Sequence, residues 1–247
     1  MHDITLVSCN YNTPEQIQVL LKSWAFHNAD VSRKCLIMEH SNNEETIPFY
    51  ADNEIPYVRN RGSVHYRGVE AALQLVNTKY MLLVDSDVVF HKSIKSIIDH
   101  HIMNNIHLAG RVEGDRGGYL LYKRIHPWFC FIDVDFVRRH SIRFADMSRV
   151  IATHSEGFYQ NVPVTQYDYI RKYDVGATFL EDAMKSGARV FNQNLEDDYF
   201  THYEGMSWRN NSNNPKLLEE HNEKLRLFDL DRDKYSSVDL KGFFDVR

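Results

Sequence analysis

The chain has 247 residues, 43% hydrophobic and 26% charged, with a formal net charge of −5 and a pI near 6.2. This length fits one large domain, or a core domain with a small appendage. The acidic balance argues against a strongly basic nucleic-acid binder, although 29 Lys and Arg residues leave a local basic groove open.

Cysteine usage and hydropathy predict a cytoplasmic protein. Cys9, Cys35 and Cys130 lie in or beside apolar runs and form no CxxC pair, so we expect buried free thiols rather than a zinc knuckle or a disulfide framework. No basic leader precedes the first short apolar run, so no signal peptide is predicted. No apolar stretch approaches the roughly 20 residues that span a bilayer, so we expect no transmembrane segment.

The first hundred residues alternate apolar strands with helices. A strand starts at residue 4, and a helix follows from Pro14 to about His27, with Thr13 as its cap. Further strands are predicted at 34–43, 55–60 and 80–87, and further helices at 62–79 and 93–105. Because each strand is almost wholly apolar, the alternation predicts a parallel sheet covered on both faces.

Polar residues collect where these strands end. They come from four separate stretches: Asn10–Tyr11–Asn12, Glu39–His40–Ser41, Arg59–Asn60–Arg61 and Asp85–Ser86–Asp87. In parallel sheets, ligands bind outside the carboxyl ends of the strands. The four stretches therefore predict one site.

The pattern changes after residue 107. A hairpin is predicted at 107–123, with its turn between Gly114 and Gly118. A strand running into a short helix follows at 127–144. A helix near residue 174 has an apolar face and ends at Gly187 before a strand at 188–191; the face comprises Phe179, Leu180, Ala183 and Met184. A late amphipathic helix is expected at 214–230.

The stretch "KYMLLVDSD" places two carboxylates, Asp85 and Asp87, directly after a predicted strand. Residues two apart on an extended chain face the same side, so both can converge on one ion. Mg²⁺ and Mn²⁺ commonly take one or two carboxylates plus substrate phosphates. A cap role is less favoured because Ser93 is better placed to cap the next helix, and Phe90 stands where an EF-hand loop requires glycine. The pair therefore predicts metal or phosphate chemistry.

Several segments, in order, resemble those of a known family. They are "ITLVSCNYNTPEQIQVLLKSW", "CLIMEHSNN", "RNRGSVHYRGVEAALQLVNTKYMLLVDSDVVF" and "YFTHYEGMSWR". This ordered set resembles the GT-A glycosyltransferases, closest to the family 2 type. The resemblance implies an α/β fold with a Rossmann-like, mostly parallel central sheet flanked by helices and a smaller mixed acceptor-side region. It implies a nucleotide-sugar-binding half at 1–106, an acceptor-binding half at 107–230 and a C-terminal tail at 231–247.

The resemblance assigns one group of residues to the nucleotide-sugar donor. Asn10 and Tyr11 would line the nucleotide pocket, and Glu39 would contact the base or ribose. Arg61 would approach the diphosphate, and Ser86 would lie beside the bound nucleotide. The second strand ends in Glu–His rather than in the family's commoner acidic pair, so the donor base stays open.

A second group would hold the metal and close the site. Asp85 would contact the ribose or metal-bound water, while Asp87 and His202 would ligate Mn²⁺ or Mg²⁺. Trp208 and Arg209 would belong to a loop over the diphosphate, although Trp208 also fits a core position.

Asp174 is the implied catalytic base, which takes a proton from the acceptor hydroxyl. The family often has Glu–Asp there, so the Glu181–Asp182 pair remains an alternative; its position midway along a helix favours it less. The expected reaction is a metal-dependent, inverting transfer from a nucleoside-diphosphate sugar to a glycan or other hydroxyl acceptor. Trp128 is the favoured aromatic for stacking on an acceptor sugar. A nucleic-acid acceptor stays open but is not favoured.

Three rival functions fit part of the pattern. An Asp-x-Asp after a strand also begins haloacid-dehalogenase-type phosphatases, but there it lies on the first strand. A nucleotidyltransferase also uses paired carboxylates and Mg²⁺, yet the chain lacks a glycine-rich, basic loop near its first strand. A non-catalytic nucleotide- or sugar-binding module on the same fold would bind a nucleoside diphosphate with metal and would not need Asp174.

Overall fold

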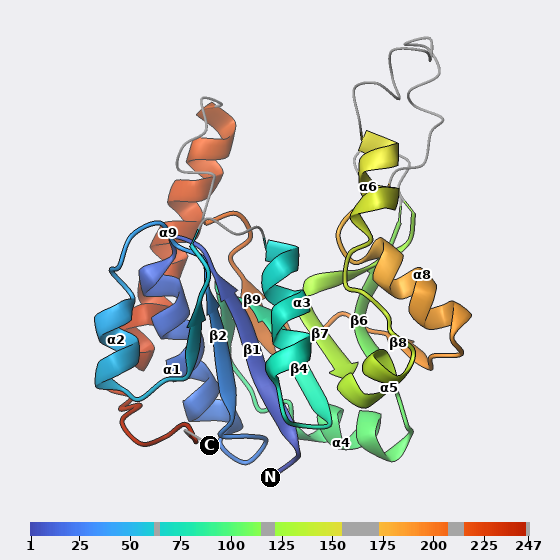
Figure 1. The fold of residues 1–247 in the computed structure, drawn as a ribbon. Coiled ribbons are helices and arrows are strands. Elements are labelled where there is room, and N and C mark those ends of the chain that lie inside the picture. Colours follow the sequence, from blue (N-terminus) through green and yellow to red (C-terminus); the bar gives the residue numbers. More distant parts are fainter. Residues whose placement is uncertain (62–64, 115–121, 155–172, 207–214, 246–247) are drawn as a thin grey trace.

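A seven-stranded sheet organises the computed structural model, which describes residues 1–61, 65–114, 122–154, 173–206 and 215–245 (Figure 1). From edge to edge the strands are β3 (Tyr57–Arg59), β2 (Cys35–Glu39), β1 (Ile4–Asn10), β4 (Tyr80–Asp85), β7 (Arg124–Asp133), β6 (Leu108–Glu113) and β8 (Val190–Asn192). β7 is antiparallel to both of its neighbours, whereas the other adjacent pairs are parallel. The α/β, mostly parallel sheet expected from the sequence is confirmed.

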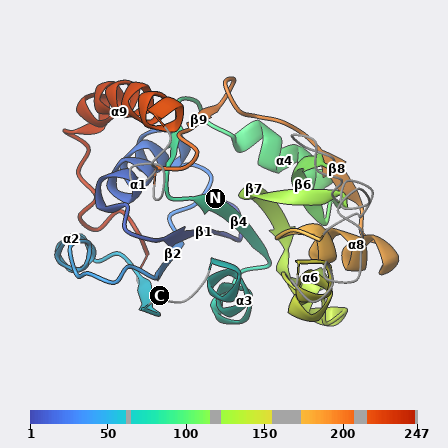
Figure 2. The same cartoon turned by 90° about the horizontal axis from the view of Figure 1, so that it is seen from above.

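Helices cover both faces of this sheet (Figure 2). One face carries α1 (Pro14–Asn28) and α4 (Lys95–Met103), and α9 (Pro215–Tyr235) packs outside α1. The other face carries α3 (His65–Leu75), α5 (Val134–Arg139), α6 (Met147–His154) and α8 (Ala177–Lys185). A short α2 (Ile47–Asp52) precedes β3, and β5 (Val88–Phe90) pairs with β9 (Phe200–His202) in a separate two-stranded sheet.

The core consists of apolar layers on both sides of the sheet. Along β1, Ile4 and Leu6 belong to the layer under α1 and α4, while Val7 and Cys9 belong to the layer under α3, α5 and α8. Alternate side chains of a strand point to opposite faces, so a strand buried on both faces must be apolar at nearly every position. This requirement explains the continuous apolar runs in the sequence.

Several sequence predictions need correction. The exposed fraction of Met184 is 60%, so this residue is not part of the buried face of α8. Thr13 precedes α1 but makes no side-chain cap bond; its hydroxyl donates to Asn10 Oδ1 instead. α9 continues past residue 230 to Tyr235. The elements α2, β5, α6 and β9 were not predicted.

Other expectations agree with the structure. The first strand of the predicted hairpin is present as β6, but it pairs antiparallel with β7, which begins at Arg124, beyond the predicted hairpin at 107–123; most of the predicted turn and second strand lies outside the described residues. All three cysteines are buried and free. Among the helices that the structure describes, none has the length and apolar character needed to cross a bilayer.

Gly68 of α3 lies against the end of β2, and substitution by alanine is expected to destabilise the fold. An added Cβ would lie 2.2 Å from Nε2 of His40 and 3.0 Å from Sγ of Cys9. His40 is buried and cannot swing away freely, because its Nδ1 is 3.0 Å from the carbonyl of Asn60. Overpacking costs about 1–3 kcal/mol, whereas alanine gains only about 1 kcal/mol in helix propensity. We expect Gly68→Ala to lower the free energy of unfolding, measured in urea.

The matched control is Arg67→Ala, an exposed change on the same helix. It reports the effect of helix propensity without new contact in the core. If Gly68→Ala were as stable as the wild type or more stable, the close approach of α3 to His40 would not require glycine at position 68.

Candidate functional site

Asp85, Asp87 and His202 converge at the end of β4, and each offers a ligand atom within 4.8 Å of the others. Nε2 of His202 is 3.3 Å from Oδ1 of Asp87 and 3.7 Å from Oδ2 of Asp85. A further histidine, His65 at the start of α3, places Nε2 3.4 Å from Oδ1 of Asp85. The predicted metal ligands are therefore brought together by the fold.

Strand pairing positions this group. After Asp87 the chain enters β5, which is antiparallel to β9 and pairs Val88 with His202. The amide of Tyr203 donates to the carbonyl of Asp87 at 2.9 Å. Because antiparallel partners are fixed by their ladder of hydrogen bonds, His202 is held beside the acidic turn despite its distance along the chain.

The pKa values of His202 and Asp85 are shifted by their neighbours towards the charged forms. Burial alone would lower the pKa of His202, but the contact with Asp87 and the charges of Asp87, Asp85 and Glu196 raise it. Burial would raise the pKa of Asp85, yet the neighbouring His65 and His202 lower it. A proton on His202 would therefore offset the repulsion between the two carboxylates.

A buried chain of hydrogen bonds leads from this acidic turn to the end of β2. Thr13 donates to Oδ1 of Asn10 at 2.5 Å, and its hydroxyl lies 2.8 Å from that of Ser86. The amide of Asn10 donates to Oε2 of Glu39 at 2.7 Å. Since the Thr13 proton is directed to Asn10, Ser86 donates to Thr13, and the network orients the backbone between Asp85 and Asp87.

Glu39 ends this network and is 0% exposed. Its Oε2 also accepts from Thr46 and Tyr50, at 2.8 and 2.7 Å, and its Oε1 accepts from the amide of Ser41 at 2.8 Å. Burial by itself would raise the pKa of Glu39, but the bonds from Asn10, Ser41 and Tyr50 outweigh it and lower the pKa. The carboxylate is thus ionised, fully engaged by the protein and closed to a nucleotide in this structure.

Glu39→Gln is expected to destabilise the protein at neutral pH by roughly 1–3 kcal/mol, because either orientation of the glutamine amide directs a donor towards another donor. The folded-state pKa of Glu39 lies below its ordinary value. Its stabilisation is therefore present above the ordinary glutamate pKa and is lost as the pH falls through the folded-state value. Urea unfolding at pH 7 and at acid pH measures both effects.

Glu45→Gln is the matched control, because Glu45 is exposed in the same loop. It should leave stability unchanged at either pH. A Glu39→Gln protein as stable as wild type at pH 7, or equally destabilised across the acid range, would contradict an ionised and fully bonded Glu39.

One face of β7 links the acidic turn to Asp174. Successive residues of a strand alternate between faces, so Arg124, His126 and Trp128 share a side. The indole of Trp128 stacks on His202, with ring centroids 5.2 Å apart, and its Nε1 donates to Nδ1 of His126 at 2.9 Å. At the other end, Arg124 forms an ion pair with Asp174.

The segment around Asp174 is fixed against the same strand. Gly176 has a φ of +85°, and a Cβ there would lie 2.2 Å from the carbonyl oxygen of Ile125. Only glycine allows both this conformation and this approach. Asp174 is thereby held just before α8, beside Arg124, with its side chain 39% exposed.

The alternative carboxylates are engaged elsewhere. Asp182 forms an ion pair with Arg149 of α6, and Glu181 lies 3.1 Å from the same guanidinium. Tyr173 also donates to Glu181 at 2.7 Å. These contacts give the pair a structural use between α6 and α8.

The remaining predicted residues are spread around the sheet edge. Tyr11, just after β1, is 43% exposed, and its hydroxyl accepts a hydrogen bond from Nδ2 of Asn42 at 3.5 Å. Arg61 is exposed and pairs with Glu44. Trp208 and Arg209 lie outside the residues that the structure describes.

Sequence reasoning missed several residues beside the site. His65, His126 and Glu113 were not singled out, although Nε2 of His126 lies 2.7 Å from Oε1 of Glu113. The signal for His126 was the alternation in "RIHPW" at 124–128, which puts the side chains of Arg124, His126 and Trp128 on one face of a strand. The start of a helix gave no comparable signal for His65.

The sequence matches no protein-family model and no curated protein. Solved structures do share its fold. They include the glycosyltransferase GlyE of Streptococcus pneumoniae TIGR4, at a TM-score of 0.53 and 11% identity over 98% of this chain and 65% of GlyE. S. aureus TarS 1–349 in complex with UDP-GlcNAc matches at a TM-score of 0.51 and 15% identity, over 94% of this chain and 66% of the TarS chain. The mannosyltransferase PcManGT of Pyrobaculum calidifontis, in complex with GDP-Man and Mn²⁺, matches at a TM-score of 0.50 and 10% identity, over 94% of this chain and 71% of the PcManGT chain.

These likenesses show the fold. The chain has the GT-A fold expected from its sequence, with an Asp-x-Asp group at the end of β4 that could hold a metal ion. It spans only 44% of the length of the full TarS chain.

Proposed function

We propose that this protein transfers a sugar from a nucleoside-diphosphate donor to a hydroxyl acceptor, in a metal-dependent reaction that inverts the anomeric centre. The observation that carries the proposal is the convergence of Asp85, Asp87 and His202 at the carboxyl edge of the sheet. In open α/β sheets, this edge is where ligands bind.

The three residues fit a divalent cation. Ligand atoms about 2.1 Å from one octahedral ion lie about 3–4 Å apart, and Nε2 of His202 is 3.3 and 3.7 Å from the two nearest carboxylate oxygens. Two carboxylates and one imidazole, with other positions left for phosphate oxygens, suit Mn²⁺ or Mg²⁺. When bound, the cation would neutralise negative charge that develops on the leaving diphosphate.

The chain's own residues would supply positioning and proton transfer. Ser86, Thr13, Asn10 and Glu39 hold the acidic turn through their buried hydrogen bonds. We assign Asn10, Ser86 and Glu39 to this positioning role, and we propose Tyr11 and Arg61 for the nucleotide pocket. Trp128 would keep the imidazole of His202 in place by stacking on it.

In the reaction, the acceptor oxygen would bond to the anomeric carbon while the bond from that carbon to the diphosphate oxygen breaks. The carboxylate of Asp174 would take the acceptor proton, and the nucleoside diphosphate would leave. Attack opposite the leaving group inverts the centre without a covalent sugar–enzyme intermediate. Arg124 would orient Asp174, since the two side chains form an ion pair.

Two neighbours support the choice of donor class. TarS was crystallised with UDP-GlcNAc, and PcManGT with GDP-Man and Mn²⁺. Both ligands are nucleoside-diphosphate sugars, so we extend this class, but neither particular sugar, to the present chain.

A thermal-shift panel tests the proposal. UDP, GDP, ADP, CDP and TDP, and sugar nucleotides carrying the same bases, are each added with and without Mn²⁺. Binding to the folded state alone raises stability in proportion to the logarithm of ligand concentration over Kd. We expect one base to stabilise the protein selectively and only with the metal. No metal-dependent shift with any nucleotide would overturn the proposed function.

A further inference from the structure

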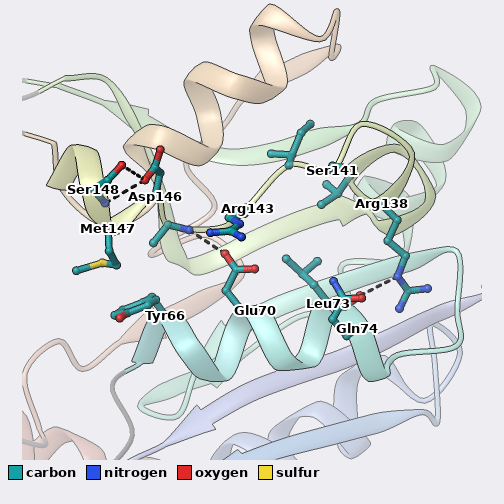
Figure 3. Close-up of a pocket in the computed structure, with 13 residues that line it drawn as sticks. Tyr66, Glu70, Leu73, Gln74, Arg138, Ser141, Arg143, Asp146, Met147 and Ser148 are labelled. Carbon is teal, nitrogen blue, oxygen red and sulfur yellow. Dashed lines mark hydrogen bonds between the residues drawn. The ribbon is translucent and has the colours of Figure 1, made fainter.

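A hollow of about 880 Å³ lies between α3 and residues 137–148, which run from the end of α5 into the first turn of α6 (Figure 3). Tyr66, Glu70 and Gln74 line it from one face of α3. Arg143 and Met147 come from the segment opposite. Because a helix rises 1.5 Å per residue, the face from Tyr66 to Gln74 is about 12 Å long. The hollow is therefore a groove longer than one sugar ring.

The groove contains a carboxylate oxygen that can accept hydrogen bonds from a ligand and a guanidinium that can donate them. Glu70 accepts a hydrogen bond from the amide of Ala145 through Oε1 only, and among the described residues no partner is found for its Oε2. Arg143 is exposed and makes no ion pair within the part of the chain that the structure describes. In contrast, Arg138 is already engaged by the protein. Its Nε donates to the carbonyl of Leu73 in α3, and its Nη2 donates to the carbonyl of Val76, the residue after α3.

These groups suit a neutral oligosaccharide. A carboxylate accepts from sugar hydroxyls and a guanidinium donates to them, while the half-buried ring of Tyr66 offers an aromatic face beside Met147. The lining carboxylates Glu70 and Asp146 oppose the charges of Arg138 and Arg143, so the groove does not favour a polyanion.

Residues beside one end of the groove connect it with both proposed reactive groups. Tyr66 follows His65, whose Nε2 is 3.4 Å from Asp85. On the opposite wall, the amide of Asp146 donates at 2.9 Å to Oγ1 of Thr178, in the first turn of α8 just after Asp174. The Tyr66 end of the groove is thus next in sequence to a residue that contacts the metal group, and its opposite wall is hydrogen-bonded to the start of the helix that follows Asp174.

We propose that this groove binds an extended, uncharged oligosaccharide acceptor and directs its terminal hydroxyl towards Asp174. The proposal rests on the proposed function and adds the class of acceptor and its place of binding. Glu70 and Arg143 would recognise hydroxyl groups of the sugars behind the reacting one, with Tyr66 under a sugar ring.

Binding to an array of neutral, sulfated and phosphorylated glycans of one to six sugars tests this assignment. We expect the wild type to retain neutral chains longer than a disaccharide. Glu70→Gln and Arg143→Ala should each weaken retention by about tenfold or more, as expected for loss of a hydrogen bond to a charged group. Arg139→Ala, an exposed arginine on α5 outside the groove, is the matched control and should bind like the wild type.

Three results would overturn the assignment. The wild type could retain no glycan, it could retain only single sugars or charged glycans, or both groove variants could bind as well as the wild type. Thermal shifts with nucleotide and Mn²⁺ should be the same for wild type and groove variants. This second measurement separates the two proposals, because a metal-dependent nucleotide shift without glycan binding sinks the groove alone.

Discussion

Replacing Asp87 with alanine is expected to abolish metal-dependent binding of a nucleoside diphosphate. Asp87 is buried, and its Oδ1 is 3.3 Å from Nε2 of His202. Loss of a residue that only orients a metal ligand typically weakens metal binding about 10–100-fold. Loss of a ligand itself should exceed this range, so the affinity for Mn²⁺ should fall by more than about 100-fold. Calorimetric titration with Mn²⁺ in the presence of nucleotide measures the change.

The matched control for this change is Asp30→Ala. Asp30 is exposed in the turn after α1 and precedes Val31, whose carbonyl accepts from the amide of His2 just before β1; its removal changes the net charge equally. If Asp87→Ala and Asp30→Ala bind Mn²⁺ and nucleotide alike, the acidic turn is not the metal site. Circular dichroism establishes that each variant is folded.

Replacing Asp174 with asparagine is expected to stop transfer while donor binding continues. An amide keeps an oxygen that can accept from Arg124, so the contact between α8 and β7 should survive. It cannot accept a proton at neutral pH. Loss of a general base typically costs roughly 10²–10⁴-fold in rate, which should appear in kcat rather than in the affinity for the donor.

Asp182→Asn distinguishes the two candidate bases. Asp182 pairs with Arg149, so its change should affect stability more than transfer. Full transfer activity of Asp174→Asn would remove Asp174 as the base. The opposite pattern, with activity lost only in Asp182→Asn, would move the base to α8.

The first half of the sheet could be predicted because its strands are short apolar runs. β1, β2 and β4 are buried on both faces, which leaves a continuous signal in the sequence. Their polar carboxyl ends correctly predicted the clustering of Asn10, Glu39 and Asp85. Glu39 was expected to contact the base or ribose, and its burial was not foreseeable, because Tyr50 of the unpredicted α2 and Thr46 just before it donate to its carboxylate.

The second half was harder for physical reasons. Strands β5 and β9 have three residues each, too few to show a period, yet their pairing brings His202 to Asp87. In β7, Pro127 lies between His126 and Trp128, and proline normally argues against a central strand. The structure accommodates it beside an irregularity in register between Gly110 and Val112 of β6.

The central claim is that Asp85, Asp87 and His202 bind a divalent cation together with a nucleoside diphosphate. Electron paramagnetic resonance of free Mn²⁺, titrated into the protein with and without UDP or GDP, tests it most directly. We predict that the protein binds about one Mn²⁺ ion per chain, seen as a loss of the free Mn²⁺ signal. At a given Mn²⁺ concentration, the signal should be lower still when the preferred nucleotide is added, because the nucleotide raises the affinity for the ion. A signal that stays unchanged with protein and nucleotide present, or that falls equally with Asp87→Ala, would contradict it.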